Sequence, residues 1–414
     1  MRFLHLSDLH LGKSLYGVSM IDQKDQEFWK DRFLEMTEEL QPDAVIIAGD
    51  VYDRSAPSAD AVMLFDDMLT RLDAMGIPVL IIAGNHDSGQ RLSFAGEILA
   101  KQKIHIAGIL EKEIRHVTIQ EKDGSGEVTF WLLPYLFPAL AAQKLEDDSI
   151  GDYETAVRRL LERQDIDFSR RNVLVCHQNI TADGKESVRG GSESMVGGVG
   201  QVDYRVFDGF DYVALGHIHA SYHVGRREVR YAGSPLCYHF DETKQPRKGP
   251  LLVEMGEKGT AVKIEIRIIE PLHPMREMKG IYEDVKQAAE ADAGKGEYLR
   301  IVITDRRITP EISDFLRELF RKRGSVVMEL LSDFRESGTG KASAEARKKE
   351  RSIEEYFAEF YRDRMAQTDP EEADLELFRF AADCARKAEP AESREEALEK
   401  DADDLLAFIL KQEG

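Results

Sequence analysis

Short apolar runs that end abruptly in polar clusters dominate the first 270 residues of the chain. The runs are mostly aliphatic and lack the alternation of a half-buried strand. Such runs are typical of strands in a sheet that is buried on both faces. The five clearest runs are 3–6, 44–48, 78–83, 173–176 and 212–215.

Two stretches between the first three runs, 25–40 and 59–75, carry apolar side chains three and four positions apart. This spacing predicts amphipathic helices, and the alternation of strand and helix predicts an α/β fold with right-handed crossovers. Further strand-like runs predict a second sheet, and with it a layered α/β/β/α sandwich over residues 1–270. These further runs are 114–119, 128–133, 229–232, 251–254 and 262–269.

The pattern changes over residues 271–335, where two helices alternate with two strands. The predicted elements are a helix at 281–291, a strand at 298–304, a helix at 310–322 and a strand at 325–331. So short a segment buries little apolar surface by itself. We therefore expect a small α/β module that packs on the first domain.

Residues 336–350 have the composition of a linker, and residues 351–414 follow it as a helical region. Apolar spacing predicts amphipathic helices at 352–365, 371–387 and 394–410. Short helices after a linker have little core of their own, so their apolar faces need a surface to pack on. That surface is either the same chain or a partner protein, and the sequence leaves both possibilities open.

The charge balance is acidic: the 414 residues include 56 Lys and Arg against 77 Asp and Glu, which gives a formal net charge of −21. A protein that holds DNA unaided usually has a basic excess, because Lys and Arg displace the counterions of the phosphates. Unaided, tight DNA binding is therefore not expected. Residues 341–414 hold 13 Lys and Arg against 21 Asp and Glu, so this region would suit a basic docking surface.

The three cysteines, Cys176, Cys237 and Cys384, are spaced too widely for a disulfide framework or a zinc site. No run approaches the roughly 18 apolar residues that a membrane-spanning helix needs. The first residues are too polar for a signal sequence. We therefore expect a cytoplasmic protein without a membrane segment.

Polar side chains with metal-binding chemistry follow each of the five strands. They are Asp8 and His10, then Asp50, then Asn85, His86 and Asp87, then His177, and finally His217 and His219. Ligands of α/β sheets collect beyond the carboxyl ends of the strands. We therefore expect these side chains to meet at one place.

Seven of them offer mixed oxygen and nitrogen donors: Asp8, His10, Asp50, Asn85, His177, His217 and His219. Such a set without thiolates favours Mn²⁺, Fe²⁺ or Zn²⁺. Seven ligands exceed the need of one ion, so two ions that share Asp50 are the economical arrangement. Two ions about 3.5–4 Å apart are typical of enzymes that hydrolyse phosphate esters. His86 is a candidate acid for the leaving oxygen, with Asp87 orienting its ring.

In this order, DLH at 8–10, GDVYDR at 49–54, GNHD at 84–87, His177 and GHIH at 216–219 resemble the calcineurin-like metallophosphoesterase superfamily. LSDLHLGK at 6–13, ALGHIH at 214–219 and RYAGSPL at 230–236 narrow the resemblance to bacterial nuclease subunits that act with an ATPase. Residues 271–335 resemble the capping domain of these proteins, and SIEEYF at 352–357 resembles their ATPase-binding helices.

The resemblance implies two manganese ions. One would be held by Asp8, His10 and His219, and the other by Asn85, His177 and His217. Asp50 would bridge them, and His86 would act on the scissile phosphate.

The resemblance also implies a nuclease of DNA end processing, repair and recombination. It would be a 3′–5′ exonuclease on double-stranded DNA and an endonuclease on single strands and hairpins. A homodimer is implied, which would form a heterotetramer with the ATPase through residues 351–414. The chain lacks a Gly-x-x-x-x-Gly-Lys-Ser/Thr motif, so the partner would hydrolyse the ATP.

Two other functions are compatible with parts of the sequence. A phosphomonoesterase or a small-molecule phosphodiesterase could use the same two-metal core, but it would not need residues 271–414. A non-catalytic scaffold could clamp a partner ATPase, but it would not need the complete set of ligands.

Overall fold

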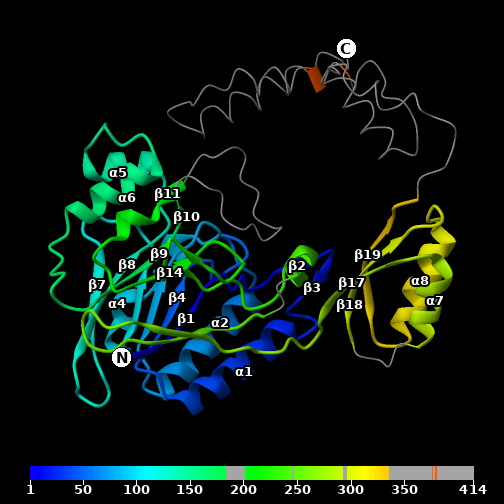
Figure 1. The fold of residues 1–414 in the computed structure, drawn as a ribbon, viewed down its shortest axis with the longest axis horizontal. Coiled ribbons are helices and arrows are strands. Elements are labelled where there is room, and N and C mark those ends of the chain that lie inside the picture. The colour runs from blue at the N-terminus through cyan, green and yellow to red at the C-terminus, as the bar shows by residue number, and fades with distance from the viewer. Residues whose placement is uncertain (183–200, 245–246, 292–295, 335–374, 376–377, 380–414) are drawn as a thin grey trace. The chain divides into compact units, whose positions relative to one another are not determined.

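The computed structural model describes residues 1–182, 201–244, 247–291, 296–334, 375 and 378–379 (Figure 1). The chain divides into two compact units, Met1–Phe334 and Arg335–Gly414. The predicted linker and all but three residues of the predicted helical region lie outside the described residues. Two six-stranded sheets form the larger part of the first unit.

The first sheet has the strand order β16-β15-β1-β4-β5-β6. Four strands run parallel: β1 (Arg2–Leu6), β4 (Ala44–Ala48), β5 (Val79–Ile82) and β6 (Ile104–Ala107). The antiparallel strands β15 (Leu251–Glu254) and β16 (Lys263–Ile266) extend the sheet beyond β1. Helices α1 (Asp25–Leu40) and α2 (Ala59–Ala74) join the first three parallel strands, as the sequence predicts.

The second sheet has the order β13-β14-β12-β9-β8-β7. Its strands are β7 (Arg115–Gln120), β8 (Glu127–Leu133), β9 (Asn172–His177), β12 (Tyr212–Gly216), β13 (His223–Val224) and β14 (Arg226–Tyr231). Helices α5 (Pro138–Leu145) and α6 (Tyr153–Glu162) come between β8 and β9.

Shorter elements fill the connections. They are β2 (Ser14–Leu15), β3 (Val18–Ser19), α3 (Gly89–Leu92), α4 (Gly96–Leu99), β10 (Asn179–Thr181), β11 (Gln201–Asp203) and the 3₁₀ helices η1 (Ala100–Gln102), η2 (Tyr204–Phe207) and η3 (Phe240–Lys244).

The predicted α/β/β/α sandwich is confirmed, but two of the apolar runs belong to the first sheet and not, as predicted, to the second. The runs at 251–254 and 262–269 were expected in the second sheet, and β15 and β16 instead belong to the first. The reason is that β15 pairs antiparallel with β1, with Arg2 opposite Glu254. The strands β9 and β12 are buried on both faces because the first sheet covers one face and the core that includes α5 and α6 covers the other.

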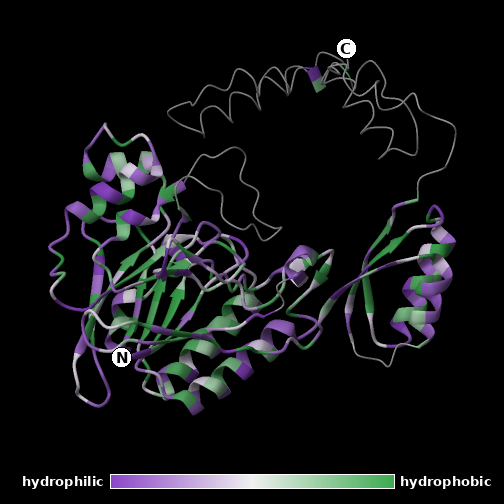
Figure 2. Ribbon diagram, viewed as in Figure 1, coloured by the Kyte–Doolittle hydropathy of each residue, from purple (hydrophilic) through white to green (hydrophobic). Residues whose placement is uncertain are grey.

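Hydrophobic cores separate the layers. The core between the sheets includes Phe3, Ile46, Leu80, Phe130, Val173 and Tyr212. Trp29 and Phe33 of α1 pack on the outer side of the first sheet, and Leu145 and Leu160 of α5 and α6 on that of the second. Figure 2 shows the result, with hydrophobic strands and helices of mixed character. No helix among the described residues is long and apolar enough to cross a bilayer.

The segment after residue 271 forms a parallel sheet of the order β17-β18-β19 with two helices. Its elements are β17 (Met275–Gly280), α7 (Tyr282–Glu290), β18 (Tyr298–Ile303), α8 (Pro310–Arg321) and β19 (Val326–Ser332). Strand β17 escaped prediction because its sequence, MREMKG, has no apolar run. The segment contacts the sandwich through Tyr298, whose hydroxyl donates to the buried carboxylate of Asp25 at 2.5 Å.

Candidate metal centre

Strand ends from both sheets meet at one place. Strands β9 and β12 end at His177 and Gly216, which are register partners in the parallel pair. The ring of His177 reaches the first sheet, with Nδ1 2.8 Å from the carbonyl oxygen of Ala48 at the end of β4. The carboxyl ends of β9 and β12 therefore lie beside that of β4, and the candidate ligands are at or just after these strand ends.

Backbone groups from other strands hold the two carboxylates. One oxygen of Asp8 accepts a hydrogen bond from the N–H of His217 at 3.0 Å, and the Ser7 hydroxyl donates to the other. One oxygen of Asp50 accepts from the N–H of His86 at 2.9 Å. Each carboxylate is thus fixed by a loop from a different strand.

The candidate side chains converge. Among the described residues, three groups bring their ligand atoms within 4.8 Å of one another: Asp8, His10 and His219; His10, Asp50 and His86; and Asp8, Asp50 and His177. Asn85 Oδ1 lies 3.1 Å from Nε2 of His177 and 2.9 Å from Nδ1 of His217. All seven predicted ligands and His86 therefore lie in one cluster.

Hydrogen bonds on the far side of a ring determine which nitrogen can bind a cation. The Ala48 carbonyl oxygen only accepts, so Nδ1 of His177 carries a proton and Nε2 faces the cluster. That Nε2 lies 3.4 Å from Asp50 Oδ2 and 3.1 Å from Asn85 Oδ1. A ring lone pair facing two oxygen acceptors is repelled unless a second proton or a cation lies between them. The donor set therefore fits a divalent metal ion.

The charges within the cluster depend strongly on one another. Burial disfavours a charged imidazole, but the Asp50 carboxylate raises the pKa of His177 to about 9. Burial, together with the charge of His177, lowers the pKa of His217 to about 3. Burial opposes ionisation of Asp50, yet His177 and His10 hold the pKa of its carboxyl below the usual range. Asp50 is therefore an ionised, buried carboxylate that requires positive charge beside it.

The backbone of the cluster is strained. Four candidate residues have φ in the left-handed region: Asp8 (53°), His10 (43°), Asp50 (50°) and His217 (100°). Residues in such sparsely populated conformations cost roughly 1–3 kcal/mol each and gather at functional sites. Gly49, beside Asp50, leaves no room for a side chain, because a Cβ there would lie 2.2 Å from Nδ1 of His177.

A buried ion pair supports His219, and sequence reasoning missed it. Nδ1 of His219 lies 3.2 Å from Oε1 of Glu242. Lys248 Nζ donates to Oε2 of Glu242 at 2.7 Å, to Ser234 Oγ at 2.8 Å and to the His219 carbonyl oxygen at 2.7 Å. Burial opposes ionisation of Glu242, but His219 and Lys248 lower its pKa to about 2. The charged stretch around Glu242 has the composition of an exposed loop, so no signal in the sequence indicates that Glu242 is buried beside His219.

The two predicted catalytic residues do not interact as expected. Nδ1 of His86 lies 2.9 Å from the carbonyl oxygen of Asp53, so Nε2 is the nitrogen that can face a substrate. The carboxylate of Asp87 accepts from three backbone N–H groups, those of Val51, Tyr52 and Gly84, at 3.1, 2.9 and 2.9 Å. The prediction that Asp87 orients the His86 ring is therefore wrong, because Asp87 binds the loops after β4 and β5 together.

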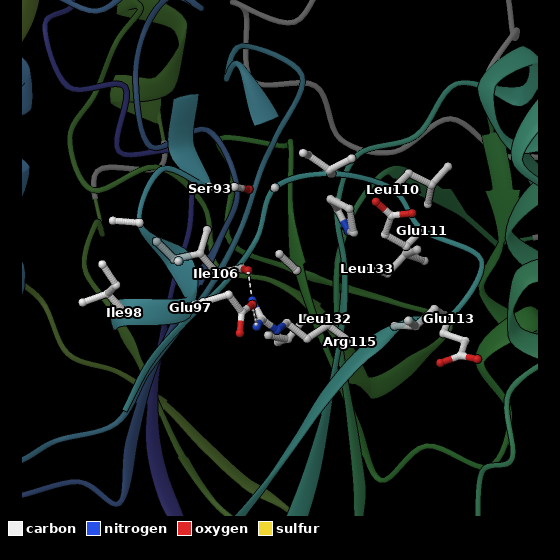
Figure 3. A pocket seen from close by; sticks show the side chains of 17 residues that line it. Ser93, Glu97, Ile98, Ile106, Leu110, Glu111, Glu113, Arg115, Leu132 and Leu133 are labelled. Atoms are coloured by element: carbon white, nitrogen blue, oxygen red, sulfur yellow. Dashed lines mark hydrogen bonds and ion pairs between the residues drawn. The ribbon is translucent and has the colours of Figure 1, made fainter. Parts of the chain in front are cut away.

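A cavity of about 560 Å³ has walls from α4, β6, β8 and the connection that follows β6 (Figure 3). Arg115 donates to the carbonyl oxygen of Ile106 at 2.7 Å and pairs with Glu97 at 2.6 Å. The remaining lining is largely apolar and includes no candidate ligand. Pro134, at its edge, leads to Tyr135, whose ring centre lies 6.2 Å from that of His217.

Comparison with known proteins adds two family matches. Residues 1–221 match the calcineurin-like phosphoesterase family, and this range includes every candidate site residue. Residues 271–365 match the family described as the type 5 capsule protein repressor C-terminal domain.

Two curated relatives are similar over most of their length. The SbcD subunit of the nuclease SbcCD from Staphylococcus saprophyticus is 35% identical over 307 residues, which cover 72% of this chain and 77% of the relative. Its counterpart from Staphylococcus epidermidis is 30% identical over 308 residues, which cover 74% and 79%. A solved structure from Thermus thermophilus covers 56% of this chain and 89% of its own, at 12% identity and a TM-score of 0.34, too low to support an argument.

Proposed function

Because the chain belongs to the calcineurin-like phosphoesterases and, among them, to the SbcD nucleases, we propose that it cuts DNA as the nuclease subunit of an ATPase-driven complex. Membership of this family makes it a hydrolase that acts on phosphodiesters. The observation that carries the proposal is the overlap of three ligand groups, which share Asp8, His10 and Asp50, in one largely buried cluster.

The cluster supports two metal ions. Asp8, His10 and His219 are proposed to hold one, and Asn85, His177 and His217 the other, with Asp50 bridging them; manganese fits this donor set. Bound there, two divalent ions would lower the pKa of water and neutralise charge on the phosphoryl oxygens.

His86 is proposed as the acid that protonates the leaving oxygen. Its ring lies edge-on to that of His10, with centres 4.7 Å apart, and its side chain is exposed at the cluster. The Asp53 carbonyl oxygen holds the proton on Nδ1, so Nε2 is the nitrogen that can pass a proton to the substrate. Asp87 contributes indirectly, through the loops that place Asn85 and Asp50.

The finer activities are proposed from the family resemblance of the sequence motifs. They are 3′–5′ exonuclease action on double-stranded ends and endonuclease action on single strands and hairpins, in DNA repair and recombination. ATP dependence would come through an SbcC-type ATPase, since the chain has no Gly-x-x-x-x-Gly-Lys-Ser/Thr motif for binding the phosphates of ATP. A cytoplasmic location is proposed with this role.

We propose residues 351–414 as the contact with the ATPase, and residues 1–270 and 271–335 as nuclease and capping domains. A homodimer is proposed from the family resemblance, and the exposed apolar side chains of Met63, Phe94 and Ile98, on α2 and around α4, are candidates for its contact. The hydrogen bond from Arg91 to the Ser55 carbonyl oxygen, 2.8 Å, brings α3 close to the segment before α2. Two copies with two ATPase subunits would form a heterotetramer.

The test is a matrix of metals and substrates on the purified chain, with and without the partner ATPase. The proposal predicts manganese-dependent cutting of single-stranded DNA by the chain alone, and ATP-dependent cutting of linear duplexes with the partner. Turnover of a small aryl phosphate without any cutting of DNA would instead identify a small-substrate phosphatase.

A further inference from the structure

Two aromatic side chains beside the metal centre belong to none of the described hydrophobic cores. Tyr135 and Phe137 lie in the loop between β8 and α5, and Phe137 is 55% exposed. Single exposed apolar residues are common and carry no meaning by themselves. The position of this pair is what distinguishes it.

The loop is fixed to the centre at several points. The N–H of Tyr135 donates to the carbonyl oxygen of Ala83 at 2.9 Å, two residues before Asn85. The Tyr135 ring centre lies 6.1 Å from that of His177 and 6.2 Å from that of His217. Its hydroxyl lies 3.3 Å from that of Tyr153 on α6. Tyr135 is therefore a rigid wall of the centre.

The Phe137 ring extends this wall. Its centre lies 5.0 Å from that of Tyr135, edge-on at 87°. Because the ring centres of Tyr135 and His217 lie 6.2 Å apart, the ring centre of Phe137 lies within about 11 Å of that of His217. Successive phosphates of a strand advance by about 3.4 Å along a duplex, so this distance corresponds to no more than about three nucleotides.

The accessible side of the cluster is the side on which these rings lie. Asp8 and His177 are buried, whereas Asn85 and His86 are exposed and His217 is partly exposed. A phosphodiester must approach from that accessible side, and Tyr135 is next to His217 there. The ring faces of these aromatic side chains offer a base a surface to stack on.

We propose that Tyr135 and Phe137 form a stacking site for a nucleobase next to the scissile phosphate. The inference rests on the proposed nuclease function and deepens it. A paired base inside a duplex must first be unstacked, whereas a base in a single strand or a frayed end is free. The site would therefore bind unpaired nucleotides, and with little regard to sequence, since every base has a π-face.

The test measures how far cutting depends on the base. Single-stranded oligonucleotides of one sequence, each with one abasic residue at a successive position, are cut by the full chain with Mn²⁺. In the wild type, an abasic residue within three nucleotides of the cut is expected to lower kcat/KM by about 5-fold to about 100-fold, the range of a base–aromatic stack. In Phe137→Ala the ratio between normal and abasic strands falls to near one, and Phe137→Trp restores it.

Phe168→Ala is the matched control. Phe168 is 42% exposed and lies edge-on to Phe210, before the opposite end of β9. This variant keeps the wild-type ratio. If the Phe137→Ala enzyme keeps the wild-type ratio between normal and abasic strands, the proposal is overturned. A loss of self-association together with that unchanged ratio would show that Phe137 contacts a second copy of the chain instead of a base. A wild type that hydrolyses methyl p-nitrophenyl phosphate but cuts no oligonucleotide would instead refute the nuclease function itself.

Discussion

At the scale of single residues, Gly49 shows how tightly the metal centre is built. Its φ is +88°, and a Cβ would lie 2.2 Å from the His177 ring, which is itself bound to Ala48. Gly49→Ala therefore combines left-handed strain of about 1–2 kcal/mol with overpacking of about 1–3 kcal/mol. We expect a fall in the free energy of unfolding of about 2–5 kcal/mol, measured by urea denaturation.

Gly76→Ala is the control for this prediction. Gly76 has a similar φ of +71°, but nothing in the described part of the chain lies within 4 Å of an added Cβ. This variant carries the backbone strain alone and costs about 1–2 kcal/mol. Equal losses in the two variants would show that Gly49 is needed only for its backbone conformation.

The support of His219 by Glu242 gives a second prediction at this scale. Glu242→Met removes the acceptor of the His219 Nδ1 proton. It should weaken Mn²⁺ binding about 10- to 100-fold, because losing the hydrogen-bond partner of a metal-binding histidine typically has an effect of this size. It also leaves the buried Lys248 without its carboxylate, which costs about 3–5 kcal/mol of stability. Calorimetric titration with Mn²⁺ measures the affinity.

The double variant Glu242→Met/Lys248→Met separates the two effects. Without the unpaired charge most of the stability returns, while the affinity stays low because the Glu242 carboxylate is still missing from Nδ1 of His219. Wild-type affinity in both variants would contradict the role assigned to Glu242.

The sequence predicts residues such as Asp8, His177 and His219 because they directly follow buried strands. It does not predict Glu242, since its burial and its ion pair exist only after η3 folds under the cluster. It misassigned Asp87 because adjacency to His86 suggested a contact, whereas the turn directs its carboxylate to loop N–H groups.

At the scale of elements, one arginine of β18 joins the segment after residue 271 to two elements of the sandwich. The guanidinium of Arg300 lies 4.7 Å from the centre of the Phe240 ring in η3 and 3.2 Å from the hydroxyl of Tyr16 in the β2–β3 hairpin. Arg300→Ala removes the hydrogen bond that the guanidinium donates to Tyr16, worth about 1 kcal/mol. Amide exchange in the hairpin Ser14–Ser19 should then be about 5-fold faster, since local opening costs less.

Arg306→Ala is the matched control, because Arg306 lies 4.5 Å from the Tyr282 ring and pairs with Asp305 within its own segment. It should leave exchange in the hairpin unchanged. If both variants accelerate exchange there equally, Arg300 has no special connection to the hairpin.

Helices and buried strands are predictable at this scale because their apolar periodicity is local. Helix α1 (Asp25–Leu40) and strand β4 (Ala44–Ala48) have the predicted bounds. Sheet membership is not local: β15 joins β1 across most of the chain, and β17 forms at an edge from polar residues. Neither pairing has a signal within the strand's own sequence.

At the scale of the whole molecule, the acidic region after residue 340 gives a prediction about assembly. Deleting residues 351–414 should abolish association with a large ATPase, because their apolar faces and negative charge are the proposed contact. Manganese-dependent cutting of single strands should persist, since the first unit is compact without them. Co-purification and an oligonucleotide assay measure the two properties. A truncated chain that still binds the ATPase would contradict a docking role for this region.

The acidic balance of the chain agrees with the proposed dependence on metals and a partner. A formal net charge of −21 disfavours binding to the phosphates of DNA, so attraction must come from a local site. Two divalent ions beside Asp8 and Asp50 would supply positive charge at the place where a phosphate binds.

The most direct test of the account counts bound metal ions and follows cutting in the same samples. Mn²⁺ titration of the metal-free chain, read by electron paramagnetic resonance, should give two ions per chain, and cutting of single-stranded DNA should appear as both bind. In Asp50→Ala both ions should bind more weakly and cutting should be lost with them. Cutting by the metal-free protein, or by Asp50→Ala at the wild-type rate, would contradict two-metal hydrolysis at this centre.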